Sequence, residues 1–169
     1  MVELKQYDLK FAEAYSKLRT NPNIYINGLD ITPNPLTVDD AIALFTKSME
    51  KRPAERLLIF YNNEFCGDIS ISVMGDICRF NAELGYWIAE PFWNKGIATV
   101  AIELMTKYVF DNFNIQKIVA CVYEFNKASM RALEKNGYIL EALLKKEIFK
   151  NGAFYDDYRW IKFREANNY

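Results

Sequence analysis

The residues best suited to chemistry lie between positions 84 and 99. An apolar strand-like run, residues 84–88, leads into a short loop in which Gly96 and Ala98 open a long helical pattern. Backbone N–H groups at the start of a helix attract anions, and small side chains let a pyrophosphate approach the backbone closely. The spacing therefore predicts an anion site, unless Gly96 and Ala98 only permit a tight strand-to-helix turn, because glycine patterns are common.

The residue types that are missing narrow the chemistry further. The chain has no histidine, which removes the usual general base, the Ser-His-Asp triad and the commonest metal ligand. Cys66, Cys78 and Cys121 form no CxxC pair, and an odd number of cysteines suits reduced thiols better than a disulfide framework. Each lies in an apolar stretch, so we expect all three to pack in the core. The sequence predicts chemistry without a metal or a nucleophilic cysteine.

Residues 84–99 resemble motif A of the GNAT N-acetyltransferase superfamily. They are most similar to the branch with ribosomal-protein-alanine and spermidine acetyltransferases, whose signature is GYWI…P…W-x-K-G-x-A-T. Asn94 stands where that branch usually has a glycine or a glutamine-like residue. Residues 126–138 resemble the family's N-x-x-S-x-x-x-L-E-K-x-G-F/Y helix, and residues 141–158 its terminal N-G-x-Y-D-D hairpin, with Ala142 replacing a glycine. The resemblance covers nearly the whole chain.

The resemblance implies a mixed-layer α/β fold, the GNAT fold, with a central, mostly antiparallel, splayed sheet flanked by helices. It also implies direct transfer of the acetyl group of acetyl-CoA to a primary amine, without an acyl-enzyme intermediate. The independent absence of an activated serine or cysteine nucleophile agrees with that mechanism. The alternative is a non-catalytic acyl-CoA-binding or regulatory module of the same fold, and a plain interaction domain would bind no CoA.

The cofactor-binding residues follow from the same resemblance. Trp87 and Ile88 would pair through their backbones with the pantetheine arm, and the Ile88 N–H would stabilise the developing oxyanion. Asn126 would contact the cofactor or bridge an open strand edge, although an asparagine there also suits a helix N-cap. The backbone amides of five consecutive residues would cradle the pyrophosphate: Lys95, Gly96, Ile97, Ala98 and Thr99.

Two catalytic residues are expected, Ser129 and Glu83. Ser129 matches the position from which branch members offer a hydroxyl to the leaving thiolate, but it also reads as a surface serine in a first helical turn. Tyr123 and Tyr138 are alternative candidates for the acid, although both are equally well explained as packed aromatics.

A carboxylate acting through water would replace the missing histidine as the base. Strand alternation places Glu83, Gly85 and Trp87 on one face, which favours Glu83, although a solvated strand glutamate explains it equally well. Three other acidic residues could serve as the base or bind a cationic substrate: Glu147, Asp156 and Asp157.

The acceptor amine is left open. A protein N-terminus, a polyamine, an aminoglycoside and a small amino compound all fit the sequence. Five aromatic residues could line an acceptor cavity, although such residues more often form the core: Tyr25, Trp87, Phe92, Phe149 and Tyr155.

Periodicity predicts the elements that position these residues. The prolines, asparagines and glycine of residues 21–35 predict a loop, and Gly137 should end a helix. Asn151-Gly152 is a strong hairpin signal. Helices are expected at about 8–18, 37–50, 97–109 and 127–136, and strands at 56–61, 65–73, 77–88 and 117–123, before two final strands.

Composition sets the class of protein. The 169 residues are 51% apolar and 25% charged, which predicts one folded domain over residues 1–169. A net charge of −1 disfavours nucleic-acid binding. No apolar run approaches the roughly 18–20 residues of a membrane span, and the chain start lacks a signal-peptide core. We therefore expect a cytoplasmic monomer or homodimer whose partner is the amine substrate.

Overall fold

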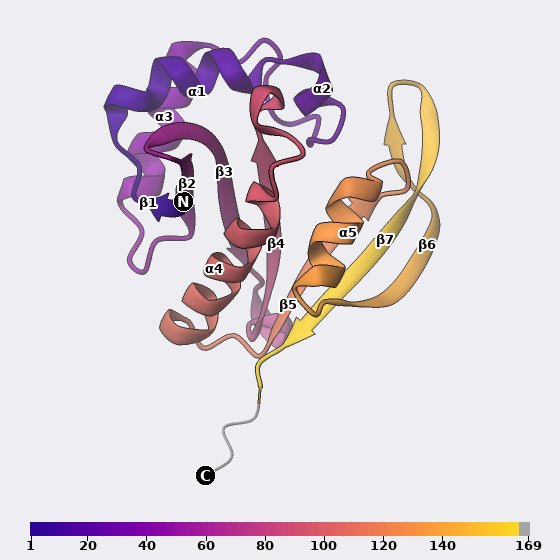
Figure 1. Ribbon diagram of the computed structural model, residues 1–169. Coiled ribbons are helices and arrows are strands. Elements are labelled where there is room, and N and C mark those ends of the chain that lie inside the picture. The colour runs from indigo at the N-terminus through magenta and orange to yellow at the C-terminus, as the bar shows by residue number, and fades with distance from the viewer. Residues whose placement is uncertain (166–169) are drawn as a thin grey trace. The chain divides into compact units, whose positions relative to one another are not determined.

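The computed structural model describes residues 1–165, and their contacts divide the chain into two compact units. The first unit comprises residues 1–70 and 86–101, and the second comprises residues 71–85 and those from 102 onward. The strands are hydrogen-bonded in the order β1-β2-β3-β4-β5-β7-β6 (Figure 1). Most neighbours in that order are antiparallel, so the predicted α/β class with a mostly antiparallel sheet is confirmed.

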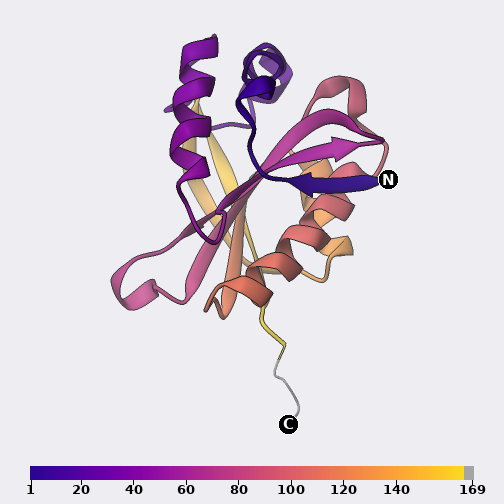
Figure 2. The ribbon, with the colours of Figure 1, turned by 90° about the vertical axis from the view of Figure 1, so that its left-hand side faces the viewer.

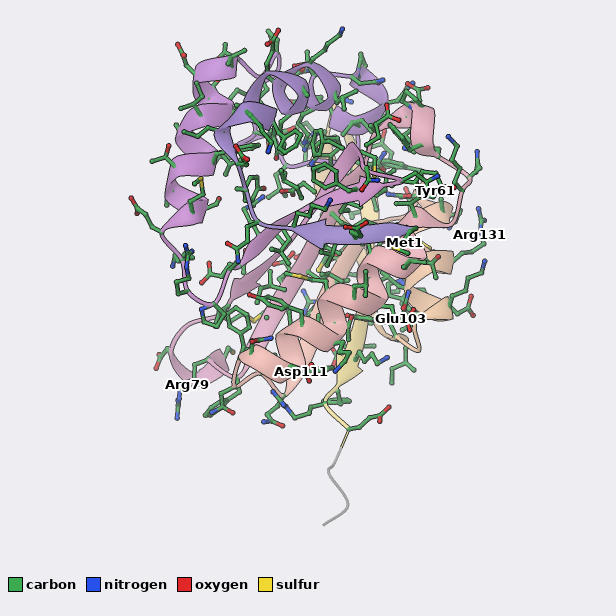
Figure 3. The ribbon with its side chains drawn as sticks, turned by 60° about the vertical axis from the view of Figure 1, so that its left-hand side comes forward. Met1, Tyr61, Arg79, Glu103, Asp111 and Arg131 are labelled. Carbon is green, nitrogen blue, oxygen red and sulfur yellow. The ribbon has the colours of Figure 1, made fainter. Side chains whose placement is uncertain are left out.

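Three strands pair in the first unit. β1 (Val2–Lys5) runs antiparallel to β2 (Arg56–Tyr61), with Val2 opposite Tyr61. Figures 2 and 3 show β1 beside the end of β2, and Figure 3 labels Met1 and Tyr61 there. β3 (Glu64–Val73) continues the antiparallel pairing on the other side of β2.

Four helices of the first unit lie between β1 and β2 in sequence: η1 (Leu9–Phe11), α1 (Ala12–Arg19), α2 (Pro22–Tyr25) and α3 (Val38–Met49). Thr37 begins α3 with a capping box, in which the Asp40 N–H donates to Thr37 Oγ1 at 3.1 Å and the Thr37 N–H donates to Asp40 Oδ2 at 3.0 Å. This confirms the predicted start of the helix. α1 packs against α3, and an aromatic core forms beneath them from Tyr7, Tyr15, Phe45, Phe60 and Phe65.

The strands of the second unit combine parallel and antiparallel pairing. β4 (Asn81–Ile88) runs parallel to β5 (Lys117–Tyr123), and their pairing ends where Glu83 faces Val119. β7 (Ala153–Phe163) lies antiparallel to both β5 and β6 (Ile139–Lys150).

The turn between β6 and β7 confirms the predicted hairpin. Asn151 has φ 50° and Gly152 has φ 80°. Two consecutive positive φ values are what a type I′ turn requires, and asparagine followed by glycine meets that demand at low steric cost.

Of the helices in the second unit, α5 (Lys127–Lys135) ends where Gly137 predicted, whereas α4 (Ile97–Asn112) continues beyond the expected end near residue 109. α4 contributes its residues from 102 onward, and α5 is stopped by Gly137, which has φ 72°. Arg164, which directly follows β7, contacts the last turn of α4 and the segment after it: its guanidinium nitrogens donate to the carbonyls of Phe110, Phe113 and Ile115 at 2.5, 2.7 and 2.9 Å.

Some expectations were wrong in detail. β1 was not expected, and the segment 21–35, predicted as a loop, contains α2, whose start is capped by Asn21. The strand predicted from residue 77 begins at residue 81, because a 3-10 turn (Asp76–Cys78) precedes it. Cys66 is buried as expected and Cys121 is half-buried, but Cys78 is exposed, because it lies in that turn rather than in a strand.

A single domain over residues 1–169 stays a prediction, and its last four residues lie outside the described part of the chain. Within residues 1–165, no helix is both long enough and apolar enough to cross a membrane.

Candidate active site

The loop between β4 and α4 has the geometry of an anion-binding helix start. Asn94 and Gly96 both have left-handed backbones, with φ 61° and 73°. Asparagine tolerates that region better than most residues, which explains how Asn94 can stand where the resembling branch usually has a glycine or a glutamine-like residue. A Cβ built on Gly96 would meet no atom within 4 Å, so the space above this residue is open. α4 begins immediately afterwards at Ile97, and its first turn directs N–H groups toward that end.

Side chains of the first unit hold this loop in place. Trp93 Nε1 donates to the Ile88 carbonyl at 2.7 Å, and the Lys95 ammonium donates to the Pro91 carbonyl at 3.1 Å. The Ala89 N–H donates to the Cys66 carbonyl at 2.8 Å, which joins the loop to β3. These hydrogen bonds fix the backbone of the loop that is predicted to bind the pyrophosphate.

The predicted pyrophosphate-binding residues lie together in this loop. Lys95 and Gly96 are exposed, Ala98 and Thr99 are half-buried, and Ile97 is buried beneath them. Both interpretations of the two small residues are compatible with this geometry. Gly96 does permit the turn, since its φ is positive, and it also leaves open space at the head of α4.

Gly67 is a site residue that the sequence argument did not identify. A Cβ at this position would lie 2.2 Å from the Trp87 carbonyl oxygen and 3.2 Å from the Ile88 Cα. The backbone of β3 thus approaches β4 at the two residues expected to hold the pantetheine arm. The signal was available, because a glycine inside a strand pattern often marks such an approach.

Trp87 lies against the aromatic core of the first unit. Its ring contacts Tyr15 and Phe65 edge-on, with centroids 5.3 and 6.2 Å apart. The Arg19 guanidinium lies 5.8 Å from the Trp87 ring centroid. Two of the aromatic residues expected near the acceptor, Tyr25 and Phe92, belong to this unit as well, and Phe92 is buried.

Asn126 and Ser129 lie at the start of α5 in the second unit. Asn126 Oδ1 accepts a hydrogen bond from the Ser129 N–H at 3.2 Å. Asn126 is therefore a helix N-cap, which is the structural role weighed against cofactor contact above. Ser129 is half-buried in the first turn of the helix. Tyr138, an alternative candidate for the acid, is 2% exposed and its hydroxyl pairs with Thr106 at 2.8 Å, which supports a packing role.

Glu83 belongs to a group of three titratable residues in the second unit. It is exposed on β4, and its charge acts on Cys121, as does the charge of Asp157. Burial first, and then these two negative charges, raise the pKa of the Cys121 thiol to about 12. Burial likewise raises the pKa of Cys66 to about 12. Both thiols stay protonated at neutral pH, so neither is an activated nucleophile.

Asp156 and Asp157 differ sharply, although they are neighbours. Asp156 accepts hydrogen bonds from the Lys145 ammonium at 2.8 Å and the Lys146 N–H at 2.9 Å, and these bonds lower its pKa. Asp157 is 2% exposed, and its Oδ1 is buried with no hydrogen-bond partner within residues 1–165. Burial raises the Asp157 pKa, which makes it a second carboxylate suited to proton transfer.

The remaining expected residues of the terminal hairpin lie in the second unit. Phe149 is 59% exposed, and the Tyr155 ring lies edge-on to Phe125 with centroids 5.1 Å apart. Within residues 1–165, no group of three or more cysteine, aspartate or glutamate side chains is arranged to hold a metal ion.

Comparison with known proteins identifies the family to which this chain is similar. The acetyltransferase (GNAT) domain family matches residues 2–139. The uncharacterized N-acetyltransferase YokL from the SPbeta prophage of Bacillus subtilis (strain 168) is 30% identical over 133 residues, which are 78% of this chain and 73% of the relative. The ribosomal-protein-serine acetyltransferase of Escherichia coli (strain K12) is 31% identical over 62% of this chain and 57% of its own length. The spermidine N(1)-acetyltransferase of that strain is 26% identical over 72% of this chain and 64% of its own length.

Solved structures agree on the fold. The microcin C7 self-immunity acetyltransferase MccE, in complex with acetyl-CoA and AMP, has a TM-score of 0.80 and 26% identity, covering 96% of this chain and 92% of that chain. The ribosomal-protein-S5-alanine acetyltransferase from Vibrio fischeri has a TM-score of 0.86 at 18% identity, covering 98% and 94%. The chain spans only part of its curated relatives: 73% of YokL, 57% of the ribosomal-protein-serine acetyltransferase and 64% of the spermidine N(1)-acetyltransferase. It spans 53% of one further curated relative. Because the family model matches residues 2–139, most of the chain, this chain belongs to the GNAT acetyltransferase family.

Proposed function

We propose that this protein is an N-acetyltransferase that transfers the acetyl group of acetyl-CoA directly to a primary amine. The observation that carries the proposal is Gly96, which has a left-handed backbone and open space above it at the start of α4. Phosphates need this combination of close backbone approach and converging N–H groups. The family match and the acetyl-CoA complex of MccE support acetyl-CoA as the ligand.

Each residue has a specific role in this proposal. The amides of residues 95–99 bind the pyrophosphate, and the backbones of Trp87 and Ile88 hold the pantetheine arm. Bound acetyl-CoA supplies a thioester carbonyl that an amine can attack. The Ile88 N–H is the donor for the negative charge that develops on the carbonyl oxygen, and the rigid attachment of β4 through Trp93 and Ala89 keeps this donor in place.

Proton transfer is assigned to the residues of the second unit. Glu83, through a water molecule, accepts the proton of the attacking amine, and Ser129 donates a hydrogen bond to the departing thiolate. Asp157 is the rival base, because its pKa is raised by burial while Glu83 is exposed. Asn126 orients the start of α5 and thereby the Ser129 backbone.

Two measurements test the proposal. Titration calorimetry with acetyl-CoA measures binding, and release of free CoA thiol with a panel of amines measures transfer. Gly96→Glu introduces bulk and negative charge at the phosphates and strains the left-handed backbone, so we expect acetyl-CoA binding to be lost. Gly75→Ala is the matched control, because a Cβ there meets no atom within 4 Å and its φ is −98°.

The outcomes distinguish an acetyltransferase from a non-catalytic acyl-CoA-binding module of the same family. Amine-dependent thiol release establishes the enzyme. Tight acetyl-CoA binding without release for any amine would support the non-catalytic acyl-CoA-binding module. Unchanged affinity in Gly96→Glu would remove the loop from the binding site.

A further inference from the structure

Arg19 is a buried cation with an unused donor. It ends α1 in the first unit and is 9% exposed. Its Nη1 is buried and has no hydrogen-bond partner within residues 1–165. A buried guanidinium is normally paired, because an uncompensated charge and an unsatisfied donor both cost free energy. Arg19 therefore needs an acceptor that the described residues do not supply.

Trp87 offers a second buried N–H donor beside it. The Arg19 guanidinium lies 5.8 Å from the Trp87 ring centroid, and Trp87 Nε1 is likewise buried without a well-formed hydrogen bond among the described residues. This N–H is close enough to the Tyr15 hydroxyl to oppose part of the rise in the Tyr15 pKa. Arginine and tryptophan N–H groups only donate, so together they select a group rich in acceptors, such as a carboxylate or a phosphate.

The surrounding charges also favour an anion. Asp68 is the carboxylate of this cluster, and its two oxygens are engaged by Arg56, at 3.4 Å, and by the Tyr7 hydroxyl. Burial raises the pKa of Tyr7 and of Tyr15 far above neutrality, so neither adds negative charge. Two guanidinium groups thus face a single carboxylate. A surplus of positive charge remains whether Asp68 is ionised or protonated.

The position of the guanidinium depends on a glycine. A Cβ at Gly28 would lie 2.5 Å from Arg19 Nη2, so Arg19 can occupy its place only because Gly28 has no side chain. Trp87 immediately precedes Ile88, the residue whose N–H is proposed to stabilise the oxyanion. An anion held by Arg19 and Trp87 would therefore belong to a ligand bound beside the proposed reaction centre.

We propose that Arg19, together with Trp87, binds an acidic group of the acceptor, so that the substrate is an amine that also carries a carboxylate or a phosphate. This inference rests on the acetyltransferase function proposed above and names its substrate class. Amino acids, peptides with an acidic group near the N-terminus and aminoalkyl phosphates meet the description. A polyamine does not, because its charges repel the surplus positive charge. A neutral amine leaves both donors unsatisfied.

Matched pairs of amines test the inference. Glutamate is compared with its diamide, and phosphoethanolamine with ethanolamine, alongside spermidine, by the initial rate of CoA thiol release. We expect each acid to exceed its neutral partner in kcat/KM by about 10- to 100-fold, the range for a charge-assisted hydrogen bond in a buried site. Arg19→Gln should abolish this preference.

Gly28→Ala is the second variant, and it retains every charge. We expect it to reduce the preference as well, because the new Cβ displaces the guanidinium. Melting temperatures establish that both variants fold. An equal loss of rate for acids and neutral amines would assign Arg19 a structural role and overturn the inference. A weaker acetyl-CoA affinity in Arg19→Gln would overturn it too, because the bound anion would then be a phosphate of the cofactor.

A binding measurement without turnover tests the anion site independently of the proposed acetyltransferase function. The same amines are titrated into the protein saturated with CoA, which carries no acetyl group to transfer. Acids that bind at least about tenfold more tightly than their neutral partners, with the difference lost in Arg19→Gln, support the anion site even if no amine is acetylated. Acetylation of spermidine or of the neutral amines as readily as of the acids would refute the anion site and leave the acetyltransferase function standing. Equal or undetectable binding of acids and neutral amines would refute the anion site as well.

Discussion

Substituting Gly67 by alanine perturbs the proposed acetyl site through the backbone alone. The new Cβ would lie 2.2 Å from the Trp87 carbonyl oxygen, whereas real Cβ atoms keep at least 3.0 Å, so the strands must separate by about 0.8 Å. The neighbour is backbone rather than a flexible side chain, and it cannot rotate away. The displacement falls on Trp87 and Ile88, which are proposed to hold the pantetheine arm and the oxyanion.

The expected size of the effect follows from that displacement. Overpacking of a buried site costs about 1–3 kcal/mol of stability. Misplacing a reacting group by about 1 Å lowers rates by up to about 100-fold. We therefore expect Gly67→Ala to remain folded, with a reduced free energy of unfolding, and to lose about 10- to 100-fold in kcat/KM.

Urea denaturation and steady-state thiol release measure the two effects separately. Gly75→Ala is again the control, because it makes the same chemical change where a Cβ has open space. It should be neutral or slightly stabilising. If Gly67→Ala matches this control in both stability and kcat/KM, the close approach of β3 does not position the acetyl site.

Three further substitutions address the proton chemistry. Ser129→Ala should lower kcat by about 10- to 100-fold and leave the acetyl-CoA dissociation constant unchanged, because the Ser129 N–H still donates to Asn126; an unaltered kcat would reject its role as the acid. If Glu83 is the base, Glu83→Gln should lower kcat/KM by about 10- to 100-fold with the acetyl-CoA dissociation constant unchanged, and an unaltered kcat/KM would favour Asp157. Burial raises the folded-state pKa of Asp157, so the folded protein binds more protons than the unfolded chain and loses stability as pH rises above about 4. Asp157→Asn should remove that loss, and equal pH slopes of unfolding free energy in variant and wild type would contradict it.

Local patterns predicted most of the elements that surround the site. The apolar run of residues 84–88 and the small residues after it identified β4 and the start of α4, and Thr37 and Asp40 marked the beginning of α3. Asn151-Gly152 gave the hairpin because only a few residue types tolerate two positive φ values in succession. Such signals succeed because their physics is confined to a few neighbouring residues.

Other features could not be predicted from local patterns, because they depend on partners that are distant in the sequence. β1 has only four residues, and it forms because β2, more than fifty residues later, offers an unpaired edge. Cys78 was expected inside a strand, yet it lies exposed in a 3-10 turn, since residues 76–78 do not reach the pairing that begins at residue 81. A short apolar run cannot distinguish these cases by itself.

The sequence by itself identified the family and the loop between β4 and α4, because both are carried by residue types at short, fixed spacing, and its lack of histidine excluded histidine chemistry. Tertiary structure decided which glycines and which charges matter. Gly67 became important only when β4 lay against it, and Arg19 only when Trp87, Gly28 and Asp68 surrounded it. Burial is the physical reason: solvent satisfies an exposed donor or charge wherever it lies, whereas a buried one must find its partner in three dimensions.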